Sequence, residues 1–134
     1  YFNKILLVSS TSTMQTGNRW VLLEHSGAPD DPNGKHYDLL LENGDSCKSW
    51  RLSEIPSIDS TDVIATALPP HKLIWLGVQS KQVSGGRGIA KRLMAGIYKG
   101  HITNTISKPL RIFLKSDSME GGLVIKGDRC NLFK

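Results

Sequence analysis

The sequence predicts a mainly β protein, most simply a small antiparallel β-barrel with short helical or 3₁₀ segments. Short runs of β-branched, aromatic and aliphatic residues recur along the chain, separated by turn-forming residues. Asn43-Gly44 lies between two such runs and is the strongest hairpin signal. Residues 89–95 alone have helical character, over a length too short for a stable isolated helix. This pattern is typical of a small barrel or sandwich.

The elements follow from the same pattern, in chain order. Residues 9–18 are rich in Ser and Thr without apolar periodicity, so residues 1–18 are expected to form an N-terminal arm or edge segment. Residues 19–134 would then form the folded domain. Strands are predicted at residues 19–25, 36–42, 46–52, 61–67, 73–78, 96–99, 110–115 and 122–126.

Length and charge limit the class of protein. The 134 residues suffice for one domain, and 17 Lys and Arg against 12 Asp and Glu favour an anionic partner such as nucleic acid. No leader pattern or apolar run of about 20 residues is present, so we expect a cytoplasmic protein without a membrane partner. A monomer is also expected. Cys47 and Cys130 are far apart and are expected to be free, buried thiols.

Two of the predicted strands bring together the donor atoms of a metal site. His36 and Asp38 are two residues apart, so their side chains share one face of a strand. His25 can meet them if its strand pairs alongside. A lone strand histidine is more often structural, but two nitrogen donors and a carboxylate suit a divalent first-row ion. They would also leave coordination positions open for water or a substrate phosphate.

Two further segments could contact a phosphate. His71 precedes a predicted strand, where its imidazole could reach a phosphate or donate a proton; an exposed loop histidine is the alternative. Residues 83–92 (VSGGRGIAKR) combine a flexible backbone with three cations, but match neither a P-loop nor a dinucleotide fingerprint. No G-x-S-x-G nucleophile motif is present, and His101 is expected at the surface.

Five segments in order carry a resemblance to a known family. They are residues 22–25 (LLEH), 36–42 (HYDLLLE), 48–52 (KSWRL), 69–75 (PPHKLIW) and 83–88 (VSGGRG). Over about residues 19–130 the chain resembles the phosphoesterase domain of bacterial DNA ligase D, and still more its short stand-alone relatives.

The resemblance implies a β-barrel enzyme that uses Mn²⁺ or another divalent transition metal. Such enzymes act on DNA or RNA–DNA 3′ ends, remove a terminal ribonucleotide or a 3′-phosphate, and leave an end that a DNA ligase or polymerase can use. Carried over by position, His25, His36 and Asp38 would hold the metal for catalysis, and His71 would contact the scissile phosphate.

The chain departs from the family at three positions. Leu40 stands where the family has Arg, Trp75 where it usually has Tyr, and Glu54 at the apparent place of a Lys. Residues 29–35 also lengthen the loop before His36. The phosphate would therefore be bound by other cations, and the candidates are Arg87, Lys91, Arg92, Arg51 and Lys72.

Two alternatives to the enzyme remain at this point. A catalytically impaired, nucleic-acid-binding relative is favoured by the loss of the family's Arg, whereas the retained ligand set favours the enzyme. A non-haem iron oxygenase would use His36, Asp38 and His101 as its triad. The chain is short for the barrel and cosubstrate pocket of that class.

Overall fold

A computed structural model describes residues 18–29, 31, 34–58, 61–103 and 108–134. The predicted arm over residues 1–18 lies outside the described residues, except for Asn18. The elements in the described part are β1 (Arg19–Ser26), β2 (Lys35–Asn43), β3 (Ser46–Leu52), β4 (Val63–His71), η1 (Leu73–Gly77), β5 (Ser80–Gln82), β6 (Ile89–Lys99), β7 (Leu110–Ser116), β8 (Glu120–Lys126) and β9 (Arg129–Phe133).

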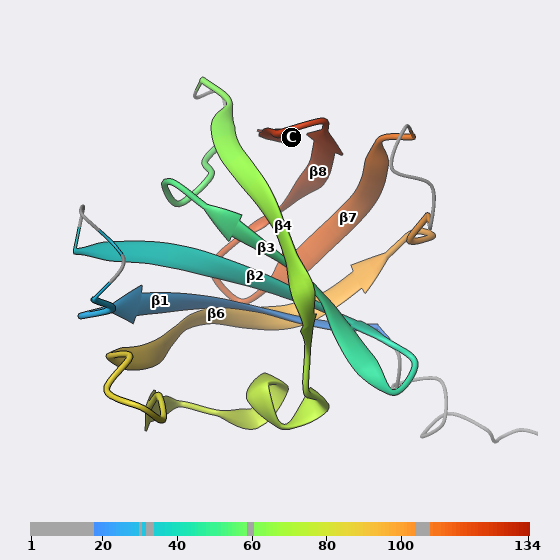
Figure 1. The fold of residues 1–134 in the computed structure, drawn as a ribbon. Helices are drawn as coiled ribbons and strands as arrows, with labels where there is room; N and C mark the ends of the chain where they lie inside the picture. The colour runs from blue at the N-terminus through green and yellow to red at the C-terminus, as the bar shows by residue number, and fades with distance from the viewer. Residues whose placement is uncertain (1–17, 30, 32–33, 59–60, 104–107) are drawn as a thin grey trace, which may run out of the picture.

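The strands form one antiparallel sheet that closes on itself (Figure 1). Their order is β1-β2-β3-β4-β9-β8-β7-β6-β5, and β6 also pairs along β1. The second pairing closes eight strands into a barrel, while β5 is joined to the outside of this ring through β6. The predicted small antiparallel β-barrel is therefore confirmed.

Several predicted elements differ from those observed. Residues 73–78, predicted as a strand, contain the 3₁₀ helix η1, whose Leu76 packs on the outside of the barrel. Residues 89–95, which had helical character, form the first part of β6 because β1 offers them a partner along their whole length. The short strands β5 and β9 were not predicted. The hairpin was predicted correctly, with Asn43 opposite Ser46 and Gly44 in the turn at a φ of 72°.

Side chains fill the barrel interior because alternate residues of each strand point inward. Trp20, Leu39, Leu41, Trp50 and Leu52 belong to this inner cluster. The Trp20 indole Nε1 donates to the backbone oxygen of Lys115 at 3.3 Å. Gly96 permits this close approach, since a Cβ there would lie 1.8 Å from the same oxygen.

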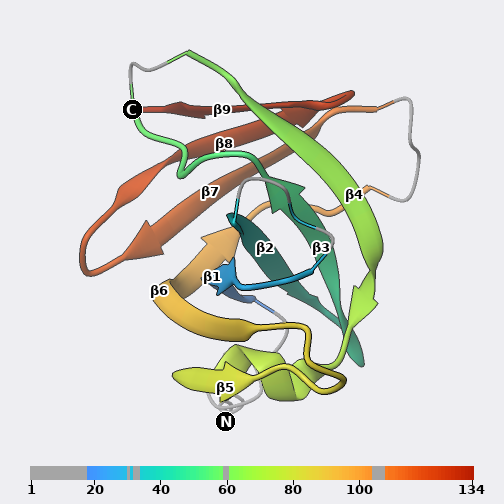
Figure 2. The same ribbon diagram turned by 60° about the vertical axis from the view of Figure 1, so that its left-hand side comes forward.

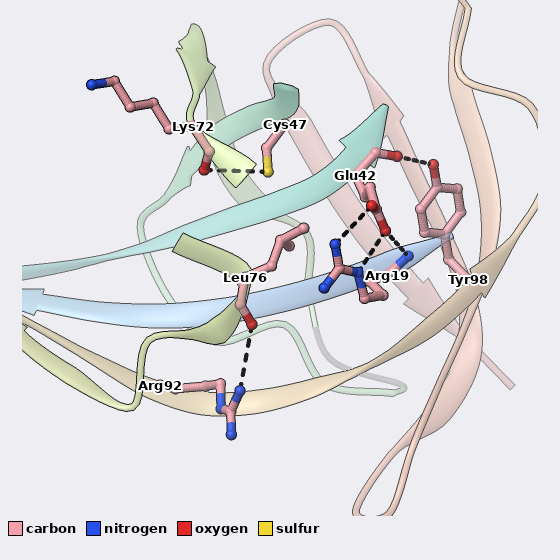
Figure 3. A network of polar contacts seen from close by, with 7 residues as sticks. All are labelled: Arg19, Glu42, Cys47, Lys72, Leu76, Arg92 and Tyr98. Atoms are coloured by element: carbon pink, nitrogen blue, oxygen red, sulfur yellow. Dashed lines mark hydrogen bonds and ion pairs between the residues drawn. The ribbon is translucent and has the colours of Figure 1, made fainter. Parts of the chain in front are cut away.

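A second apolar cluster lies on the outer side of β1, β2 and β3, where η1 covers it. It comprises Val21, Leu23, Leu40, Cys47 and Leu76. Figure 2 shows η1 and β5 together on the outside of the barrel, beside β6. Polar contacts hold this cover down: the Cys47 thiol lies 3.8 Å from the backbone oxygen of Lys72, and Arg92 donates to that of Leu76 at 3.5 Å (Figure 3).

Both cysteines are free and buried, as expected from the sequence. Burial raises the pKa of the Cys47 thiol to about 11 and that of Cys130 to about 12. Both thiols are therefore protonated and unreactive near neutral pH. Among the described residues, no helix has the length and apolar character needed to cross a bilayer.

Candidate metal centre

The paired strands β1 and β2 bring His25, His36 and Asp38 together on the outer wall of the barrel. His25 lies directly opposite His36 in the register of the two strands. Leu39 belongs to the inner cluster, so the alternating residues His36 and Asp38 point outward. One potential ligand atom from each of the three residues lies within 4.8 Å of the others. The group predicted from the sequence could therefore hold a metal ion.

The outer hydrogen bonds of the two imidazoles determine which ring nitrogens face each other. His25 Nε2 lies 2.6 Å from the backbone oxygen of Arg87, and His36 Nδ1 lies 2.9 Å from Asp31 Oδ2. Both partners accept, so these nitrogens donate their N–H groups outward. The remaining nitrogens, His25 Nδ1 and His36 Nε2, are 3.1 Å apart. In the neutral rings, two lone pairs therefore point at each other, an arrangement that a cation between them stabilises.

The Asp38 carboxylate completes the group. Its Oδ2 lies 3.9 Å from His25 Nδ1, and its Oδ1 lies 3.6 Å from His36 Nε2. The side chain is only 10% exposed, and Oδ1 is buried without a hydrogen-bond partner among the described residues. Burial raises the pKa of Asp38, against the opposing effects of the three nearby imidazoles and of Arg51. A bound cation would satisfy this desolvated carboxylate.

The donor set limits the kind of ion but does not identify it. Two imidazole nitrogens and one carboxylate oxygen are used for several divalent transition metals, including iron and zinc as well as manganese. The group thus combines His36 and Asp38 with His25 as the third candidate ligand. His101, which the oxygenase hypothesis required, is exposed beyond the end of β6 and is not part of the group.

A cavity of about 750 Å³ adjoins the metal centre. Its lining residues include His25, Asp38, Leu68, Pro69, Pro70, Ile74, Trp75, Lys81 and Val83. Arg51 and His71 also line it. Arg51 is the cross-strand neighbour of Asp38, and its Nε, like His71 Nδ1, is buried without a hydrogen-bond partner in the described part of the chain. Two polar side chains whose hydrogen-bonding capacity is not fully used within the described residues thus line the cavity beside the candidate metal centre.

The other predicted phosphate contacts divide into two groups. Arg87 and Lys72 line the cavity, although the Arg87 guanidinium already donates to Ser84. Lys91 and Arg92 do not line it. Lys91 is exposed on β6, and Arg92 is directed to the cover, where it holds η1 (Figure 3).

Sequence reasoning missed two polar residues. Asp31 orients His36, and its only signal was an acidic residue in the inserted loop shortly before a candidate ligand. Lys81 lines the cavity with its Nζ 5.4 Å from the Trp75 ring centroid. Leu40, which stands where the family has Arg, is fully buried in the outer cluster.

No protein-family model matches the chain, and no curated protein matches it at a significant level.

Proposed function

We propose that this protein is a metal-dependent phosphoesterase of the DNA ligase D type. Its substrates would be DNA or RNA–DNA 3′ ends, from which it removes a ribonucleotide or a 3′-phosphate for a ligase or polymerase. One observation carries the proposal: a guanidinium and an imidazole line the cavity beside the candidate metal centre, each with a buried nitrogen that has no hydrogen-bond partner among the described residues.

The side chains support hydrolysis of a phosphate ester. A bound Mn²⁺ or similar ion would polarise phosphate oxygens and lower the pKa of bound water. His25, His36 and Asp38 would hold that ion. Arg51 would donate to the phosphate and stabilise its negative charge. Water would add to phosphorus and lose a proton to the solvent, the ester bond would break, and His71 would donate a proton to the leaving oxygen.

The alternative is a catalytically impaired protein that binds nucleic acid through the same cavity. The buried Leu40 favours it, because β2 supplies no cation at this position beside Asp38. The orientation of both imidazoles favours the enzyme, since a protein that only binds nucleic acid has no need for a metal centre.

End processing of a labelled primer–template distinguishes the two functions. We expect release of a 3′-phosphate or a 3′-terminal ribonucleoside in Mn²⁺ but not in EDTA. The Asp38→Ala variant should lose at least about 100-fold in rate, because it removes a ligand and the charge that balances the ion. Asp45→Ala, at an exposed position in the β2–β3 turn, is the matched control and should retain activity. Native protein that binds the DNA but leaves its end intact would rule out the enzyme.

A further inference from the structure

The three tryptophans occupy different environments. Trp20 and Trp50 belong to the inner cluster and are 1% and 8% exposed. Trp75 instead lies on η1, outside the barrel, is partly exposed, and lines the cavity of the metal centre. Core packing therefore explains two of the indoles but not the third.

Trp75 lies close to the metal centre along the barrel wall. It packs against the outer cluster, which contains Leu23 and Leu40. Leu23 is the cross-strand neighbour of Asp38, and Leu40 is two residues from Asp38 on the same face of β2. Residues two apart on a strand are separated by about 7 Å. The indole and the metal centre are thus adjacent parts of one cavity.

The cavity wall near Trp75 is apolar, with cations at its margin. Leu68, Pro69, Pro70, Ile74 and Val83 line it, and Ile74 is 63% exposed. The Lys81 ammonium lies over the indole ring, 5.4 Å from its centroid, so a base that stacks on this face would displace the ammonium toward the anionic part of the ligand. An aromatic surface with neighbouring cations, next to a phosphate-binding group, suits a nucleotide: the base stacks on the ring and the phosphate faces the metal centre.

We propose that Trp75 stacks on the base of the terminal nucleotide, so that the ligand of this cavity is a strand end that carries a base. The proposal deepens the function given above and rests on it for the position of the phosphate.

Binding without turnover tests the stacking. Two single-stranded oligonucleotides with the same 3′-phosphate would be compared in EDTA, one ending in adenosine and the other in an abasic sugar. Affinity would be measured by the anisotropy of a 5′ label, and stacking by quenching of tryptophan fluorescence. We expect the adenosine end to bind about 10-fold more tightly, and it alone to quench the fluorescence.

The variants assign this preference to one residue. Trp75→Leu should abolish the preference for the base, Trp75→Phe should keep most of it, and Phe113→Leu, an exposed aromatic control on β7, should keep all of it. Equal affinity of the native protein for both ends, no measurable binding of the adenosine end, or a preference that survives in folded Trp75→Leu would overturn the proposal. If the native protein prefers the base but does not process the 3′ end in Mn²⁺, the phosphoesterase function is refuted and the stacking proposal stands.

Discussion

At the scale of single residues, the metal centre depends on the direction in which two ring N–H groups point. Asp31 accepts a hydrogen bond from His36 Nδ1–H, which leaves the Nε2 lone pair to bind an ion. Partners of this kind orient a ligand and increase its basicity. We expect Asp31→Asn to weaken Mn²⁺ binding about 10- to 100-fold, measured by titration calorimetry.

The control for Asp31→Asn is Asp45→Asn, which removes the same charge from an exposed turn. It should leave the affinity nearly unchanged, because solvent screens the exposed charge of Asp45 from an ion held at the other end of β2. An equal loss in both variants would show that Asp31 acts through net charge and not by orienting His36.

At the scale of elements, the segment between β5 and β6 positions the Arg87 carbonyl that orients His25. Gly88 fixes this segment against the end of β1, since a Cβ at Gly88 would lie 2.0 Å from the backbone oxygen of Ser26. Its φ of +93° is also unfavourable for other residues. We expect Gly88→Ala to lower the free energy of unfolding by about 2 kcal/mol and to weaken Mn²⁺ binding. Denaturant unfolding and metal titration measure the two effects.

Gly86→Ala is the control, because it introduces the backbone strain of a positive φ without the close contact that a Cβ at Gly88 would make. Gly86 also has a positive φ, of 70°, but a Cβ there would meet no atom within 4 Å. This control should cost about 1 kcal/mol and leave the metal affinity unchanged. If both variants bind the metal like native protein, the Arg87 carbonyl is not needed to orient His25.

The same elements show what could be predicted from the sequence. Strands β1 and β2 were predictable from their runs of aliphatic and aromatic residues between turn-forming residues, although both faces of each strand are buried over much of its length. The spacing of His36 and Asp38 predicted that they share a face, whereas His25 joined them only on the condition that its strand pairs alongside, as it does. The Arg87 carbonyl was not predictable, because a backbone oxygen has no sequence signature. The conformation of η1 depends on the outer cluster on which it packs, and that of the first half of β6 depends on its pairing with β1. Local sequence patterns contain neither interaction.

At the scale of the whole molecule, the barrel depends on closure between β1 and β6, and a polar network supports it. Arg19 forms two side-chain hydrogen bonds with Glu42, at 2.7 and 2.8 Å, and the Tyr98 hydroxyl donates to the Glu42 backbone oxygen (Figure 3). These contacts join β1, β2 and β6. Because the Glu42 side chain is 4% exposed, Arg19→Ala leaves a carboxylate buried without its cation.

We expect Arg19→Ala to lower the free energy of unfolding by about 2 kcal/mol, less than for a fully buried pair because Arg19 is half exposed. The melting temperature should fall by about 4–8 °C. Arg129→Ala, which disrupts an exposed pair with Asp128, should change it little. Equal melting temperatures for the two variants would show that the network does not contribute to closure.

Metal binding should stabilise the whole barrel, and the effect should depend on pH with a definite sign. Burial raises the pKa of Asp38 from its usual 3.8. Without metal, the native state therefore binds more protons than the unfolded state between 3.8 and the raised pKa, and stability falls as pH rises through that window. The ion binds only ionised Asp38, so its contribution must increase over the same window. At 100 times its dissociation constant, Mn²⁺ should add about 2.7 kcal/mol, visible in thermal unfolding and reversed by EDTA. The stabilisation by Mn²⁺ should disappear on acidification and be absent from Asp38→Ala. If Mn²⁺ still stabilises that variant, the ion binds elsewhere.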